Sequence, residues 1–122
     1  MMAVAEGRSP SALDVQLAES SGRHTLVLSG ELDMANADAL QVMVAKLCAD
    51  GAREIILDLS KLKFMDSSGL NVIITARSVC RDHGAGFGLT PPPAPVRRVF
   101  EVTGMLDVLP FVSPLSCAPD PP

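Results

Sequence analysis

Two adjacent serines behind an aspartate, in the stretch Asp66-Ser67-Ser68-Gly69-Leu70, are the residues of this chain whose types and spacing most favour chemistry. They lie between an apolar run that ends at Leu59 and a second apolar run that begins at Leu70. The first run is short and rich in branched residues, which predicts a buried strand, whereas the second continues for helical length. The serines therefore stand where a helix begins, and Asp66, Ser67 and Ser68 supply side-chain oxygens of the kind that cap its first backbone N–H groups.

A helix N-terminus needs one capping side chain, and this stretch supplies two hydroxyls. If Ser68 caps the helix, the hydroxyl of Ser67 is left free. A free hydroxyl at the positive end of a helix is a favourable position for a phosphate group, because the helix dipole and the unpaired amides both attract negative charge. The residues alone leave two interpretations open: an ordinary helix cap, and a functional serine at position 67.

The surroundings of Ser67 do not favour catalysis by its hydroxyl. His83 lies at the far end of the predicted helix, roughly 24 Å from Ser67 at the usual rise per residue, and His24 belongs to an early strand. A general base must lie within hydrogen-bond reach of its nucleophile. The order Asp-Ser-Ser-Gly also differs from the Gly-x-Ser-x-Gly nucleophile elbow. We therefore expect no catalytic residues, and we expect the chain to be the substrate of an enzyme and not an enzyme.

Neither a metal nor a cofactor is expected. Cys48, Cys80 and Cys117 are odd in number and far apart, without the close spacing of a zinc site or a redox motif. Cys48 and Cys80 fall in apolar parts of predicted helices, so we expect both to be thiols of the core. The glycines at 84–88 follow a predicted helix, whereas a dinucleotide-binding turn follows a strand and opens a helix. Gly84 is better explained as the end of that helix.

The serine pair is expected to belong to an α/β domain with a mixed, mostly parallel sheet and packed helices. Apolar alternation predicts strands at 13–18 and 24–29, which should pair as an antiparallel hairpin. Helical spacing of apolar residues predicts an amphipathic helix at 40–48, and a strand–helix–strand order with short links implies parallel neighbours. The full order expected is strand, strand, helix, strand, helix, strand, helix, strand, with strands at 54–59, 87–89 and 106–112 and helices at 67–82 and 95–103.

Three loops should meet where the parallel strands end, at 30–33, 60–67 and 90–94. Asp33, Asp66 and Ser67 would then lie on one face of the molecule. The helix that opens at Ser67 or Ser68 has apolar residues on more than one side. Either its own domain covers it on two sides, or one apolar side is kept for a partner.

Composition limits the possible partners. The chain of 122 residues is long enough for one domain, and we expect a flexible arm at 1–12 and a proline-rich tail at 113–122. Ten basic and fourteen acidic residues give a net charge of −4, which opposes nucleic-acid binding. Glu6 and Arg8 stand where a signal peptide needs an apolar core, and no apolar run approaches the ~20 residues of a membrane span. We expect a cytoplasmic protein without direct membrane insertion.

Three separated blocks resemble the STAS family, and within it most closely the anti-sigma factor antagonists. The blocks are Gly30-Glu31-Leu32-Asp33, Asp66-Ser67-Ser68-Gly69-Leu70 and the stretch from Val96 to Gly104. The likeness runs from about Asp14 to Val112 and implies a single STAS domain over 13–112. STAS domains commonly finish with another helix, which this sequence does not predict.

The resemblance implies a partner-switching module. The unphosphorylated protein would bind an anti-sigma factor that is also a serine kinase and thereby free a sigma factor. That kinase would then phosphorylate the first serine of the motif, Ser67, and a serine phosphatase would reset it. The residues assigned to partner binding are Asp33, Asp66, Ser67, Ser68, Gly69 and Leu70. Since a phosphate is tolerated at a helix N-terminus, the switch should act across the interface and not by unfolding the helix.

Two alternatives come from other classes of protein. In the first, the domain is a permanent structural subunit of a lipid-transport or signalling complex, and Ser67 is never modified. In the second, the chain is a hydrolase that uses Ser67. A non-kinase partner that co-purifies tightly would favour the first alternative, and labelling by a serine-directed activity probe would favour the second.

Overall fold

An antiparallel hairpin opens the part of the chain that the computed structural model describes, residues 13–112. Strand β2 (Leu13–Ser20) pairs with β3 (Arg23–Leu32), with Leu13 opposite Gly30 and Ser20 opposite Arg23. The turn between them uses two residues of positive φ, Ser21 and Gly22. The hairpin predicted from the alternation of apolar residues is therefore confirmed, with β3 longer than expected at both ends.

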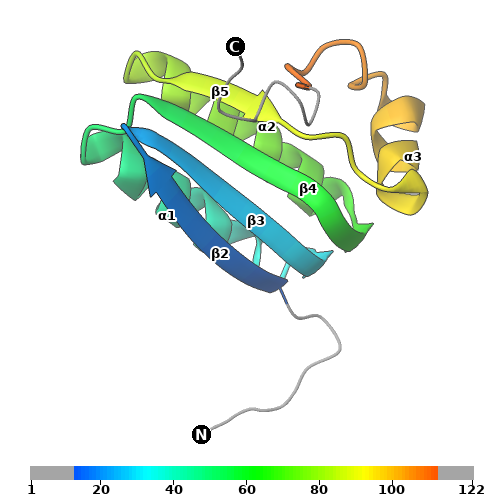
Figure 1. The fold of residues 1–122 in the computed structure, drawn as a ribbon. Coiled ribbons are helices and arrows are strands. Elements are labelled where there is room, and N and C mark those ends of the chain that lie inside the picture. The colour runs from blue at the N-terminus through cyan, green and yellow to red at the C-terminus, as the bar shows by residue number, and fades with distance from the viewer. Residues whose placement is uncertain (1–12, 113–122) are drawn as a thin grey trace, which may run out of the picture.

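The remaining elements alternate between helix and strand and build a parallel sheet onto this hairpin (Figure 1). The strand order is β2-β3-β4-β5, with only the β2–β3 pair antiparallel. The mixed α/β sheet is as predicted. The elements that follow β3 are α1 (Ala37–Ala49), β4 (Glu54–Met65), α2 (Ser67–Asp82), β5 (Gly86–Leu89) and α3 (Ala94–Thr103).

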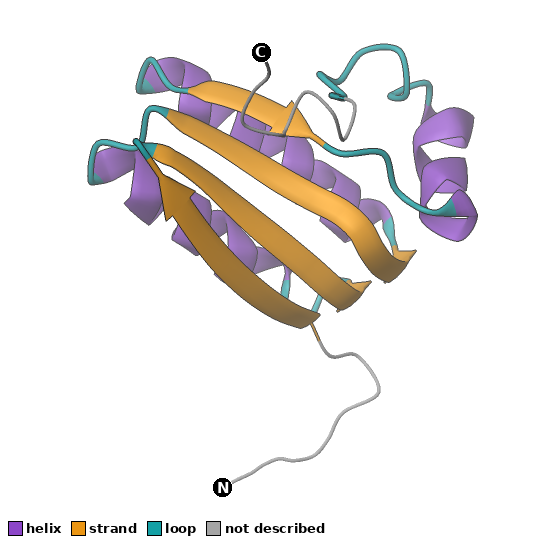
Figure 2. Ribbon diagram, viewed as in Figure 1, coloured by secondary structure: helices purple, strands orange, loops and turns teal. Residues whose placement is uncertain are grey.

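Helices α1 and α2 lie together on one face of the sheet, and α3 lies beside its end (Figure 2). The core lies between this helical layer and the sheet and is almost wholly aliphatic. Its largest fully buried side chains include Leu26 and Leu28 of β3, Ile55 and Leu57 of β4, and Ile73 of α2. The residues of α2 face both α1 and the sheet, so the domain covers this helix on two sides. Ile74 is the one large apolar side chain of α2 that is exposed.

Strand β4 continues six residues beyond its predicted end at Leu59. The stretch expected as a loop at 60–67 instead keeps pairing with β3 as far as Met65, which lies opposite Leu32. The register with β3 shifts twice on the way, so that Ser29 faces Lys61 and Glu31 faces Phe64. A bulge of this kind absorbs the extra residues and lets the strand resume. The prediction of a loop here was wrong because the polar residues of the bulge look like a strand end.

Asp58 stabilises the first of these irregularities. Its Oδ1 accepts hydrogen bonds from the amide and the hydroxyl of Ser60, at 3.0 and 2.6 Å, and from the Thr90 hydroxyl, at 2.9 Å. The same Thr90 oxygen accepts from the amide of Leu59, at 2.9 Å. Burial alone would raise the pKa of Asp58, but the bonds from Ser60 and Thr90, with the nearby charge of Lys61, outweigh it and hold the pKa below the ordinary value for an aspartate.

Asp58 is therefore expected to make folding stability depend on acid pH. A lowered folded-state pKa adds stability that is complete above the ordinary value and is lost as the pH falls through the folded-state value. We expect Asp58→Asn to be less stable than the wild type at about pH 6, and the difference between their urea midpoints to shrink as the pH falls towards about 3. Asp107→Asn, in an exposed turn, is the control. A constant difference across this range would contradict the assignment.

The prediction of a last strand at 106–112 was wrong. Residues 106–109 form turns, in which Leu109 donates to the carbonyl of Met105, and a single parallel bridge joins Phe111 to Leu89. The ring of Phe111 packs edge-on against Phe100 of α3, with 5.2 Å between the ring centroids. Pro110 has no N–H to give to a ladder, so pairing is limited to its carbonyl, which accepts from the Leu89 amide at 3.1 Å, and to the Val112 amide, which donates to Leu89 O at 2.6 Å. The expected arm at 1–12 and tail at 113–122 lie outside the described residues, as does Cys117.

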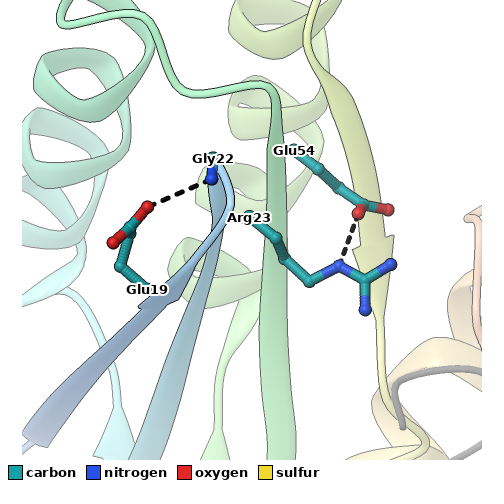
Figure 3. A network of polar contacts seen from close by, with 4 residues as sticks. All are labelled: Glu19, Gly22, Arg23 and Glu54. Carbon is teal, nitrogen blue, oxygen red and sulfur yellow. Dashed lines mark hydrogen bonds and ion pairs between the residues drawn. The ribbon is translucent and has the colours of Figure 1, made fainter. Parts of the chain in front are cut away.

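The opposite end of the sheet, where β3 and β4 begin, is fastened by polar contacts (Figure 3). The Glu19 carboxylate accepts a hydrogen bond from the amide of Gly22 at 3.0 Å, which closes the β2–β3 turn. The Arg23 guanidinium pairs with Glu54 at 2.6 Å, across the first residues of the parallel pair. Both side chains are about one-third exposed, so the pair fixes the register more than it adds stability.

Candidate functional site

The N-terminus of α2 is capped by Asp66. Its backbone is extended, with φ −107° and ψ −172°, and its Oδ1 accepts a hydrogen bond from the amide of Gly69 at 3.1 Å. This is the usual bond from a cap to the third helical residue. The interpretation that Ser68 caps the helix is therefore wrong, because the carboxylate one residue before the serines already holds the position.

Ser67 is the first residue of α2, and its side chain is exposed. Within residues 13–112 its hydroxyl has no hydrogen-bond partner. The amides of Ser67 and Ser68 belong to the first turn, where no helical carbonyl precedes them. The free hydroxyl expected at position 67 is present, although Asp66 and not Ser68 leaves it free.

The cap predicts different outcomes for two neighbouring substitutions. Asp66→Ala should destabilise the protein by about 0.5–2 kcal/mol, since it removes the acceptor of the Gly69 amide. Ser68→Ala should change the free energy of unfolding by no more than about 0.5 kcal/mol, because Ser68 makes no capping bond. Urea unfolding of both variants checks this. If Ser68→Ala lost as much free energy of unfolding as Asp66→Ala, or more, Ser68 and not Asp66 would be the capping residue.

Gly69 and Leu70 lie beneath the surface and not on it. Both are buried, and Leu70 belongs to the core. A Cβ atom on Gly69 would lie 2.6 Å from Met65 Cγ and 3.0 Å from the carbonyl oxygen of Leu32. The start of α2 therefore packs directly on the ends of β3 and β4, and the amide of Asp66 donates to Leu32 O at 3.3 Å. These two residues position Ser67 through their packing on the sheet.

The loop after β3 is held by side chains that bond to its own backbone. Asp33 Oδ1 accepts from the Ala35 amide at 3.0 Å, and Asn36 Oδ1 accepts from the Asp33 amide at 3.0 Å. Asn36 Nδ2 donates to Glu31 O at 2.9 Å. Asn36 occupies the N-cap position of α1 without making a side-chain capping bond. Asp33 is 8% exposed, while the next residue, Met34, is 77% exposed.

A groove of about 250 Å³ runs between the N-terminal halves of α1 and α2, beside the serine pair. We call it the α1–α2 groove, and it is lined by Met34, Ala37, Asp38, Gln41, Ser68, Asn71, Val72 and Thr75. Sequence reasoning did not find Met34, Asn71 or Thr75. The signal was present, since Asn71 and Thr75 follow Ser67 at steps of four and form a polar stripe on the helix.

Two of the three loops expected at this edge come together. The ends of β3 and β4 place Asp33 and Asp66 side by side, as the Asp66–Leu32 backbone bond shows. Thr90, the first residue of the third loop, does not join them. It bonds to residues 57–59 of β4, seven to nine residues or roughly 23–30 Å along the strand from Asp66, because β5 is four residues long.

Neither histidine of the chain lies beside Ser67. His24 lies opposite Ile55 near the start of the parallel sheet, and His83 caps the far end of α2. Among residues 13–112, no group of three or more His, Cys, Asp or Glu side chains is placed to hold a metal ion. Over the same residues, no helix has the length and apolar character needed to cross a membrane.

Residues 14–117 match the STAS domain family. Among curated proteins, the chain is similar to the anti-sigma-F factor antagonist RsfB of Mycobacterium tuberculosis. The two are 29% identical over 97 residues, which cover 80% of this chain and 79% of RsfB.

The chain is also similar to solved structures of anti-sigma factor antagonists. A crystal structure of an anti-sigma factor antagonist from Mycobacterium paratuberculosis superposes with a TM-score of 0.74 at 27% identity, over 84% of this chain and 87% of that one. The SpoIIAA antagonist shares the fold at 24% identity over 82% of this chain, with TM-scores of 0.71 for its unphosphorylated form and 0.66 for the phosphorylated form from Bacillus. These forms cover 87% and 90% of SpoIIAA, respectively.

Proposed function

This chain belongs to the STAS domain family, and from that premise we propose that it is an anti-sigma factor antagonist controlled by phosphorylation of Ser67. In its unphosphorylated form, the domain at 13–112 binds an anti-sigma factor that is also a serine kinase, and a sigma factor is released. The kinase then transfers phosphate to Ser67, and binding is lost. A serine phosphatase restores the binding form. All of these steps take place in the cytoplasm.

The observation that carries the proposal is the exposed, unpartnered hydroxyl of Ser67 beside a cap that does not need it. Phosphorylation of a capping serine would remove a structural hydrogen bond and alter the helix start. Here the Asp66–Gly69 bond remains whichever state Ser67 is in. The serine is thus available to a kinase at little cost to the fold, which suits a site that is modified and reset repeatedly.

The local charge explains why the phosphate would act on the interface. A phosphoserine adds about −1.5 to −2 charges at neutral pH. The unpaired amides of the first turn of α2 attract this charge, whereas the neighbouring carboxylates of Asp66 and Asp38 repel it. These local effects oppose one another, so the fold should persist. A partner packed against the same surface would meet the full added bulk and charge, and acidic groups on that partner would repel it.

Met34 is expected to anchor the partner. It is an apolar side chain, 77% exposed, at the mouth of the α1–α2 groove and held outward by a bonded loop. Apolar side chains that fill a partner's pocket carry much of the energy of an interface. We expect Met34→Ala to weaken binding about fivefold or more, measured by calorimetry with the anti-sigma factor.

Val102→Ala is the matched control for Met34→Ala. Val102 is an apolar residue of α3 that is 74% exposed and does not line the α1–α2 groove. We expect its truncation to leave the affinity unchanged. Equal effects of the two substitutions would exclude the groove as the docking surface.

The proposal is tested by incubating the purified chain with its anti-sigma factor and ATP, followed by peptide mass analysis. We expect one phosphate on Ser67, none on the Ser67→Ala variant, and normal phosphorylation of Ser68→Ala. Ser67→Ala should still bind the anti-sigma factor, because the exposed hydroxyl makes no structural bond. Phosphate on Ser68, or tight binding to a partner that has no kinase activity, would count against the proposal.

A further inference from the structure

Two thiols from different helices meet in the core. Cys48 lies near the C-terminal end of α1 and Cys80 near the C-terminal end of α2, and their sulfur atoms are 3.6 Å apart. Both side chains are buried, at 4% and 0% exposure, and both are free thiols. Nothing in the proposed switch uses this pair, which lies away from Ser67.

We propose that Cys48 and Cys80 form a redox couple that closes into a disulfide between α1 and α2 under oxidation by hydrogen peroxide. A disulfide has an S–S length of about 2.05 Å, so the sulfurs must approach by about 1.5 Å. The two side chains already touch, so the approach requires small rotations and a slight shift of two adjacent helices. The spacing of the cysteines in the sequence did not reveal this, because the pair is created by the packing of α1 on α2.

The reaction balances with peroxide as the oxidant. One cysteine, as its thiolate, attacks a peroxide oxygen and breaks the O–O bond, which leaves a sulfenic acid and releases water after protonation. The second sulfur attacks the sulfenic sulfur, forms the S–S bond and expels a second water. The two thiols lose two hydrogens and two electrons, and peroxide is reduced to two waters. A small dithiol reverses the reaction by thiol–disulfide exchange.

Burial makes this reaction slow and dependent on opening of the structure. Burial raises the pKa of the Cys80 thiol to about 12, and the contact with Cys48 adds to the effect, so thiolate is scarce in the closed core. Helix ends open more readily than helix centres, and both cysteines lie near helix ends. Oxidation should therefore proceed through local opening, and its rate should rise in urea concentrations below the unfolding transition.

The disulfide would link α1 to α2 covalently without altering the surface around Ser67. Cys80 lies about 20 Å from Ser67 along α2. The crosslink encloses the chain from 48 to 80, which contains all of β4 and most of α2, and closing such a loop restricts the unfolded state. We expect the oxidised protein to unfold at a temperature at least about 5 °C higher than the reduced protein.

The test uses the full chain with Cys117→Ser, which leaves only the two core thiols. After treatment with hydrogen peroxide, we expect intact mass to fall by two hydrogens, and digestion to yield a linked peptide that contains Cys48 and Cys80. Dithiothreitol should restore the original mass and the lower unfolding temperature. Cys48→Ala and Cys80→Ala, made in the same background, should show no such loss in the monomer.

Three results would overturn the proposal. The first is oxygen added to either sulfur without a crosslink, and the second is a disulfide only between two chains. The third is full alkylation of both thiols after peroxide treatment and denaturation. The readouts are mass and unfolding temperature, so the outcome does not depend on phosphorylation or on any partner.

Discussion

Ser67→Asp is expected to bind the anti-sigma factor at least about tenfold more weakly than the wild type, while its unfolding temperature stays within about 2 °C. Aspartate places a negative charge where the phosphate would stand. Its carboxylate can lie near the unpaired amides of the first turn of α2, so the helix tolerates it. The partner would lose about 1.4 kcal/mol or more of binding free energy, since the charge is introduced directly at the contact surface.

Ser78→Asp is the matched control, because it introduces the same charge at an exposed serine of the same helix, three turns farther along. We expect its affinity to equal that of the wild type. If both variants bind with equal affinity, the position of the charge has no effect and the interface account fails. If circular dichroism shows that Ser67→Asp melts α2, the switch would act through the fold instead.

Gly69→Ala is expected to have the largest effect on stability, a loss of about 1–3 kcal/mol. The added methyl group would lie 2.6 Å from Met65 Cγ, 2.9 Å from Leu32 Cγ and 3.0 Å from the carbonyl oxygen of Leu32. The two side chains can move by a few tenths of an ångström, but the carbonyl belongs to the end of β3 and accepts the Asp66 amide. The start of α2 must therefore shift away from the sheet, which outweighs the better helix propensity of alanine.

Gly86→Ala provides the comparison, since a Cβ there would meet Glu54 Cγ at 3.4 Å, an ordinary contact. Its urea midpoint should lie close to that of the wild type. Gly69→Ala should also slow phosphorylation of Ser67, because the helix start that presents the serine is displaced. An unchanged midpoint for Gly69→Ala would show that the helix and the sheet edge are not tightly packed at this point.

The elements set by local pattern could be predicted from the sequence. The β2–β3 hairpin follows from apolar alternation, and α1 from the spacing of Leu40, Val44 and Cys48 on one face. The extension of β4 could not be predicted in this way. It depends on a bulge held by Asp58 and Thr90, which are 32 residues apart in the chain. A long-range bond of this kind leaves no periodic signal, and the polar residues beside it imitate a loop.

The candidate site was located by its motif but explained incorrectly in one respect. The motif identified Asp66 and Ser67, and the structure brings Asp33 next to them. The two adjacent hydroxyls favoured Ser68 as the helix cap. In the structure, the Asp66 carboxylate accepts the hydrogen bond from the Gly69 amide instead. The α1–α2 groove could not be foreseen, since it exists only where the two helices pack, and Met34 is placed there by the bonds of its loop.

Phosphopeptide and intact-mass analysis of the protein purified from its own cells, with Ser67→Ala as the control, tests the central claim most directly. The proposed switch predicts a fraction of molecules with one phosphate on Ser67, which varies with growth and stress conditions and is absent from the variant. A protein that carries no phosphate on Ser67 under any of these conditions would contradict the switch and favour a permanent structural role for the domain.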